Sequence, residues 1–100
     1  MLLYNVTVGI DKEIETQWLA FIKSNYGPRV IGTGLFLDFK VYKVLTHDDD
    51  TSVSYSMQFF SDSIENVLLY LNKHAPAIVE DHRRQFKDRH IVFNTLLEEN

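Results

Sequence analysis

The sequence contains no cysteine and little glycine or proline, with 4 Gly and 2 Pro among its 100 residues. A chain without thiols has no disulfide framework, no thiol nucleophile and no zinc or iron–sulfur site built on thiolates. The few Gly and Pro, together with 45% hydrophobic residues, exclude a disordered or collagen-like chain. This length predicts one domain that spans residues 1–100, because a core of this size does not divide.

The chain also lacks an excess of positive charge and any long apolar run. It carries 10 Lys and Arg against 14 Asp and Glu, a net charge of -4, so nothing predicts a nucleic-acid partner. Apolar runs such as Val67–Leu71 are far shorter than the roughly 20 residues that span a bilayer. The first residues, Met1–Asn5, resemble no signal peptide. We therefore expect a cytoplasmic protein with no membrane partner.

The spacing of apolar residues predicts the elements in order. Residues 2–10 alternate as a strand does, and apolar residues at 14, 18, 21 and 22 form one helical stripe. That helix is expected to end near Tyr26, before one short extra turn at Pro28. Residues 35–46 and 52–60 predict a hairpin, and a second helix from Asp62 is expected to kink at Pro76 before a last strand over residues 89–97.

The order βαββαβ predicts a ferredoxin-like α+β sandwich. Right-handed crossovers place the four antiparallel strands in the order 4-1-3-2, with both helices on one face. Symmetry about the loop 47–51 predicts the hairpin pairs Phe39–Phe59, Lys40–Gln58, Val41–Met57, Tyr42–Ser56 and Leu45–Val53. The side of the sheet that faces the helices is expected to hold Tyr4, Val6, Val8, Phe39, Val41, Met57, Phe59 and Phe93.

Six short segments carry a resemblance that covers nearly the whole chain. They are YNVTV at residues 4–8, WL at 18–19, TGLF at 33–36, YSMQFF at 55–60, HAPA at 74–77 and TLLEE at 95–99. With them the chain resembles a bacterial family of short proteins classed as a domain of unknown function. The resemblance implies a dimeric ferredoxin-like fold, the dimeric α+β barrel, and supplies no catalytic residue to transfer.

The sheet face away from the helices is the first candidate for a site. Its expected polar residues are Asn5, Thr7, Asp38, Lys40, Tyr42, Ser56, Gln58 and Asn94, and its expected apolar border is Leu3, Phe36 and Phe60. A polar floor with apolar walls is typical of a ligand pocket that a second subunit closes, and equally of a wet dimer interface. Asp38 and Lys40 lie two residues apart on one strand face, where they can form an ion pair or act as a base with a stabilising ammonium.

Two of the four histidines, His74 and His82, form a secondary candidate. Eight residues of helix separate them by about 12 Å, which is too far for one metal ion, and we predict no metal site. His74 lies on the second helix, as the axial histidine does in some dimeric ferredoxin-like haem enzymes. The alternative is a histidine that caps the end of a helix.

These observations favour a homodimer that is a structural or small-ligand-binding protein and needs no cofactor. The first alternative is a cofactor-independent enzyme, monooxygenase-like or isomerase-like, with its pocket on the open face. The second is a haem-binding enzyme. No catalytic triad order and no glycine-rich phosphate loop is present in the sequence to favour either.

Overall fold

Four antiparallel strands form one sheet in the computed structural model, which describes residues 1–46, 49–87 and 90–100. The order across the sheet is β2-β3-β1-β4, which is the predicted order 4-1-3-2 read from the other edge. The strands are β1 (Leu2–Asp11), β2 (Asp38–Val44), β3 (Ser52–Ser61) and β4 (His90–Glu98). The predicted hairpin loop includes residues 47 and 48, and the predicted last strand includes residue 89; all three lie outside the described residues.

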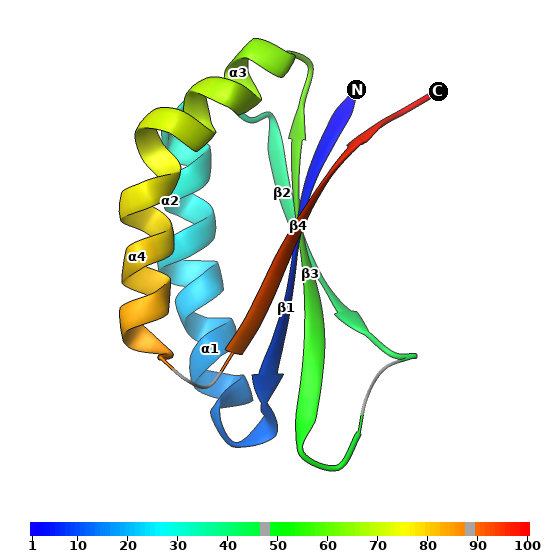
Figure 1. Ribbon diagram of the computed structural model, residues 1–100, viewed down its shortest axis with the longest axis vertical. Coiled ribbons are helices and arrows are strands. Elements are labelled where there is room, and N and C mark those ends of the chain that lie inside the picture. The colour runs from blue at the N-terminus through cyan, green and yellow to red at the C-terminus, as the bar shows by residue number, and fades with distance from the viewer. Residues whose placement is uncertain (47–48, 88–89) are drawn as a thin grey trace.

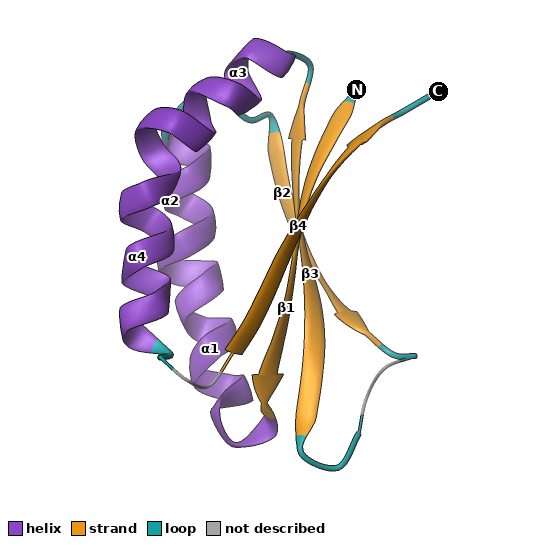
Figure 2. Cartoon of the chain, in the orientation of Figure 1, coloured by secondary structure: helices purple, strands orange, loops and turns teal. Residues whose placement is uncertain are grey.

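All helices lie on one face of the sheet and leave the other face open (Figures 1 and 2). The first helical segment is continuous and comprises a 3-10 turn (Lys12–Ile14), α1 (Glu15–Phe21), a π turn (Ile22–Tyr26) and α2 (Gly27–Gly32). The second comprises α3 (Ile64–Leu69), a π turn (Tyr70–His74) and α4 (Ala75–Gln85). None of the described helices is both long enough and apolar enough to cross a membrane.

Each proline lies in the first turn of an α-helix that follows a π turn. The Gly27 amide donates to the Ile22 carbonyl and the Ala75 amide to the Tyr70 carbonyl, five residues back in both cases. A proline inside an α-helix lacks an amide hydrogen and crowds the carbonyl four residues earlier, and a wider turn relieves both problems. The expectation that the first helix ends near Tyr26 is therefore wrong, because the π turn lets the helix pass Pro28 and reach Gly32.

The hairpin has the predicted register over β2. Phe39 lies opposite Phe59 and Val41 opposite Met57. On the other face, Lys40 pairs with Gln58 and Tyr42 pairs with Ser56. The predicted pair of Leu45 with Val53 is absent from the described ladder, which ends at Val44. This end of the hairpin extends beyond the helix layer (Figure 1), so the Leu45 side chain is 80% exposed.

The register of β4 corrects two predicted placements. Phe93 lies opposite Thr7 and Asn94 opposite Val6. Since Val6 points into the core, Asn94 lies on the helix side, and Phe93 lies on the open face with Thr7. The sequence pattern predicted Phe93 on the helix side and Asn94 on the open face, and both predictions are wrong.

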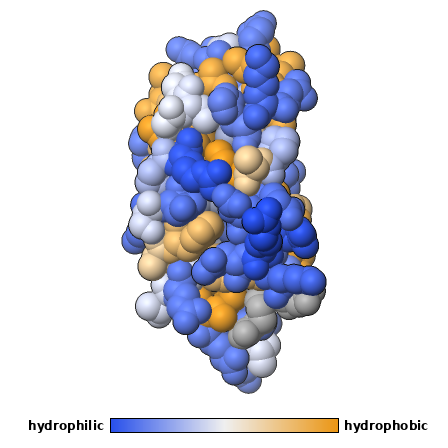
Figure 3. Space-filling view, turned by 90° about the vertical axis from the view of Figure 1, so that its left-hand side faces the viewer, coloured by the Kyte–Doolittle hydropathy of each residue, from blue (hydrophilic) through white to orange (hydrophobic). Residues whose placement is uncertain are grey.

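The core lies between the sheet and the helices. Tyr4, Val6 and Val8 of β1 are buried against Trp18 and the other helix residues, as their alternation predicted. Phe36, which was predicted to border the open face, is also in this core, because it precedes β2 and its ring packs 5.2 Å from that of Tyr70. The outer surface of the helix layer is largely hydrophilic (Figure 3).

Candidate functional site: the open sheet face

Four of the predicted site residues form one chain of hydrogen bonds on the two central strands. The Gln58 amide donates to Ser56 Oγ at 3.3 Å, Ser56 Oγ donates to Asn5 Oδ1 at 2.5 Å, and Asn5 Nδ2 donates to Thr7 Oγ1 at 2.9 Å. Thr7 accepts at its oxygen and keeps its hydroxyl proton for another partner. The chain therefore presents a donor at its Thr7 end.

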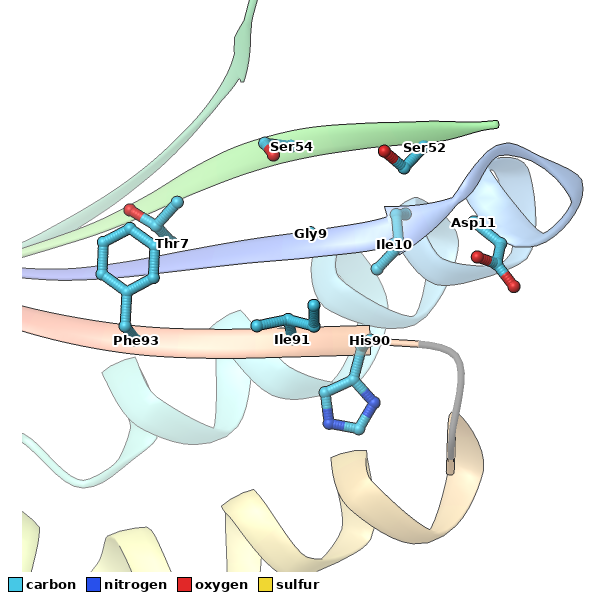
Figure 4. A pocket seen from close by; sticks show the side chains of 9 residues that line it. All are labelled: Thr7, Gly9, Ile10, Asp11, Ser52, Ser54, His90, Ile91 and Phe93. Atoms are coloured by element: carbon cyan, nitrogen blue, oxygen red, sulfur yellow. The ribbon is translucent and has the colours of Figure 1, made fainter. Parts of the chain in front are cut away.

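Thr7 borders a hollow of about 360 Å³ at one end of the open face (Figure 4). The floor carries Gly9, Ser52 and Ser54, and the wall along β4 carries Ile91 and Phe93. Ile10, Asp11 and His90 complete the lining. A hollow with an apolar wall on one side and hydroxyl groups on the other is the general form of a small-molecule site.

The hollow exists because two small residues, one on each of the two central strands, lie opposite each other near the end of the sheet. Gly9 lies opposite Ser54 on β3 and opposite Ile91 on β4. A Cβ atom built on Gly9 would approach Ser54 Oγ no closer than 3.6 Å, which is an ordinary contact. Glycine is therefore not required here by the backbone, and the space above it is open to a side chain or a ligand.

The three predicted site residues of β2 lie apart from the hollow. Asp38 accepts a hydrogen bond from the Phe39 amide at 2.8 Å, and Lys40 Nζ lies 5.5 Å from the centre of the Phe60 ring. Lys40 and Asp38 do not form an ion pair with each other within the described part of the chain. Tyr42 is half exposed further along the strand. This strand thus supplies a charged border to the open face.

The open face is most apolar along β4. Ile91 is 77% exposed and Phe93 61% exposed, and Leu97 continues the same row. Single exposed apolar residues are common on protein surfaces, but three on one face of an edge strand, with Thr95 between Phe93 and Leu97, indicate an interaction surface.

The two secondary candidates lie at different places. His74 lines a shallow groove between α2 and α4 with Arg29 and Lys73. His82 is 3% exposed in the core, where its Nε2 accepts a hydrogen bond of 2.8 Å from Trp18 Nε1. Burial, and next the charge of His90, lower the pKa of His82 to about 4, so the ring is neutral at neutral pH. No group of three or more His, Asp or Glu among the described residues is placed to hold a metal ion.

Sequence reasoning did not single out Gly9, His90 or Ile91. A signal existed for Gly9, because glycine inside a strand often marks a point where another group approaches the backbone. For β4 both alternating sets mix apolar and polar residues, so the pattern alone does not tell its faces apart.

Comparison with solved structures shows the fold. A dimeric ferredoxin-like protein from an uncultured marine organism is similar, with a TM-score of 0.67, 14% identity, and 99% of this chain and 94% of that chain covered. An ethyl tert-butyl ether d family protein from Bacillus halodurans matches with a TM-score of 0.66, 12% identity and 100% of both chains. A variant of SnoaB, a cofactor-independent oxygenase from Streptomyces nogalater, matches with a TM-score of 0.64, 9% identity, and 98% of this chain and 92% of that chain.

The first of these structures is dimeric, and the fold is α+β and ferredoxin-like in this chain as well. No curated protein sequence matches the chain. A family model does match, and it matches along residues 1–100, the same extent over which the short segments from YNVTV to TLLEE are distributed. The chain therefore belongs to the family described as a domain of unknown function, DUF4286.

Proposed function

We propose that the protein is a homodimer that binds a small molecule on its open sheet face, in the hollow beside Gly9. The observation that carries the proposal is the apolar row of β4, Ile91, Phe93 and Leu97, next to the hydroxyl-lined floor. A second copy laid against this face would cover the row and close the hollow. The dimeric state of the ferredoxin-like protein with the same fold supports the homodimer.

The lining specifies the chemistry of the ligand. Thr7 and Ser54 offer hydroxyl donors, while the Asp11 carboxylate at the same end disfavours an anion. Ile91 and Phe93 offer an apolar wall. We infer an uncharged molecule with carbonyl or hydroxyl oxygens along one side and an apolar opposite side. The other open-face residues, Asn5, Asp38, Lys40, Tyr42, Ser56 and Gln58, would then face the second subunit.

Sedimentation velocity tests the dimer. The wild-type chain should sediment as a dimer at micromolar concentration, and Phe93→Asn should shift it toward the monomer because a polar amide replaces a ring of the apolar row. Leu68→Asn is the matched control, since Leu68 is 50% exposed on α3, on the helix side. A monomeric wild type, or equal effects of the two substitutions, would refute the open face as the interface.

Thermal melting with a panel of quinones, hydroxyketones and matched carboxylates tests the hollow. A ligand at 100 times its Kd stabilises by about 2.7 kcal/mol and raises the melting temperature of a chain of this size by about 10 °C or more. Gly9→Val should abolish the effect of any hit because its side chain fills the hollow. A hit that persists unchanged in Gly9→Val would place the ligand elsewhere.

The same hollow is where a cofactor-independent enzyme of this fold would act, which is the first alternative raised by the sequence. Asp11 and His90 are the two side chains in its lining whose chemistry suits a general base, and Asp11 is the carboxylate of the pair. Turnover of a bound hit that is lost in Asp11→Asn, with binding retained, would support the enzyme. Binding without turnover supports the binding protein. A cytoplasmic location stays a prediction.

A further inference from the structure

A second, smaller cavity lies on the opposite side of the sheet, between α4 and β4. Its volume is about 160 Å³. The sheet contributes Tyr4, Val6, Val8, Met57, His90, Val92 and Asn94, and the helices contribute Tyr26, Val79, His82 and Arg83. A cavity of about 150 Å³ with apolar walls is known to take one benzene ring, so this space has the volume of a single aromatic ring.

The cavity forms because the helix layer does not fully cover β4. Val92 faces the helices yet is 40% exposed, and Val79 across from it on α4 is 47% exposed. The same register that moved Asn94 to this side of the sheet places its amide at the cavity. The apolar surface on both walls is therefore open to a molecule that enters from the edge of the sheet.

The polar groups of the lining are neutral or already paired. Burial lowers the pKa of His82 to about 4 and raises the pKa of Tyr4 and Tyr26 above the usual tyrosine value, so none of the three is charged at neutral pH. Arg83 forms two hydrogen bonds with the Glu80 carboxylate, at 2.9 and 2.7 Å. An uncharged ligand fits these surroundings better than an ion does.

His90 supplies a hydrogen-bond acceptor that can orient a ligand in the cavity. Its Nδ1 lies 2.7 Å from the Phe86 carbonyl oxygen, and a carbonyl only accepts, so Nδ1 carries the proton. In the tautomer with its proton on Nδ1, the ring has a lone pair on Nε2, and this atom has no hydrogen-bond partner among the described residues. The ring extends from β4 toward the helix layer (Figure 4) and lies edge to face with His82 at 4.6 Å between ring centres.

We propose that this helix-side cavity is a second binding site, for a small uncharged aromatic molecule, of the size of phenol or indole, whose O–H or N–H group donates to His90 Nε2. Phenols and indoles are this class. The ring would contact Val79 and Val92, the exposed apolar side chains of the lining, and the Asn94 amide at the mouth can bind a second polar substituent. The site does not depend on the dimer, and it shares only His90 with the open-face hollow.

Direct titration with phenol, indole, benzene and benzoate tests the proposal, with two readouts. Trp18 is the one tryptophan of the chain and its indole binds His82, so its fluorescence reports on the cavity wall. Isothermal titration gives the Kd. We expect phenol and indole to bind with a Kd on the order of 1 mM or below, and benzene about fivefold more weakly because it lacks the donor. Benzoate should not bind, because it brings a charge.

Three variants locate the ligand. Val79→Phe places a ring at the mouth and should abolish binding, whereas Leu68→Phe adds the same ring on exposed α3 and should leave it unchanged. Gly9→Val should also leave it unchanged, because it blocks only the open-face hollow. His90→Phe keeps the ring shape but removes the acceptor, and should bring phenol down to the affinity of benzene.

Four results would overturn the proposal: no binding of phenol or indole by either readout, binding that survives Val79→Phe, binding that Gly9→Val removes, or benzoate that binds as well as phenol. Loss in Gly9→Val with retention in Val79→Phe would assign the ligand to the open face and leave the proposed function standing. If phenol or indole binds at the helix side and no compound binds in the open-face hollow, the helix-side site stands and the proposed function is refuted.

Discussion

Acid should destabilise this protein through one buried side chain, His82. Its folded pKa is lowered from 6.5 to about 4, first because burial penalises the charged ring and next because His90 lies beside it. The unfolded chain therefore binds a proton at a higher pH than the folded protein does. The stability due to neutral His82 is fully present above about pH 6.5, falls as the pH drops toward 4, and changes no further below that.

The size of the effect follows from the two pKa values. They differ by about 2.5 and each pKa unit corresponds to 1.36 kcal/mol, so the free energy of unfolding should fall by about 3 kcal/mol between pH 6.5 and pH 4. For a domain with a total stability of about 5 to 15 kcal/mol this is a large fraction. Among the described residues, hydrogen bonds lower the pKa of Asp49 to about 2 and that of Glu80 below its usual value, and both carboxylates are exposed, so we assign the change in this window to His82.

Urea unfolding at a series of pH values, followed by Trp18 fluorescence, measures this dependence. His82→Gln keeps an oxygen acceptor for the Trp18 indole and removes the titration. We expect the variant to be less stable at pH 7.5, because the fit is poorer, but to lose about 3 kcal/mol less than the wild type on going to pH 4. A wild type that is equally stable at pH 6.5 and pH 4.5, or a variant with the same acid dependence, would show that His82 is not held neutral by burial.

Three further predictions concern stability and association. Gly27→Ala should lower the free energy of unfolding by about 1 to 3 kcal/mol, because its Cβ would lie 2.1 Å from the Phe39 ring, and Phe39→Leu should rescue this loss. Gly32→Ala has open space around it and should raise the free energy of unfolding by up to about 1 kcal/mol. Chemical denaturation measures both variants. Trp18→Ala should cost about 3 to 5 kcal/mol, since Trp18 is fully buried and binds His82, and a melting shift of only a few degrees would contradict this. A Phe93→Asn monomer should bind the hydrophobic dye ANS more strongly than the wild-type dimer, and equal dye binding would argue against an apolar interface on the open face.

The sequence was sufficient where one face of an element is plainly apolar. Val6 and Val8 alternate with polar residues in β1, and Phe39 and Val41 alternate with charged or hydroxyl residues in β2. The faces of both strands could therefore be predicted, and so could the register of β2 against β3. In β4 this contrast is missing, because Phe93 and its neighbours on both faces are largely exposed. Its placement is set by pairing with β1, which no local pattern encodes.

The candidate site was predictable only in part for a related reason. The hydrogen-bonded chain from Gln58 to Thr7 involves residues that alternate within two paired strands, and strand pairing was predictable. The bond between Trp18 and His82 joins residues 64 apart in the sequence, and the hollow beside Gly9 depends on what three strands place around it. Contacts of this kind follow from the assembled fold and not from spacing.

The π turn in the first helix has a consequence for how this sequence can change. Trp18, Ile22, Tyr26 and Val30 are all buried at intervals of four residues. In a regular α-helix each such step turns the side chain by about 40° away from the previous one, and the wider turn at Ile22–Tyr26 returns the later residues to the core. Deleting one residue from this turn would restore regular winding and place Tyr26 and Val30 three and seven residues after Ile22, spacings that still face the core. Related sequences should therefore be able to lose one residue at this turn and keep the same buried stripe in a regular helix, so that the wider turn and one residue of length disappear together.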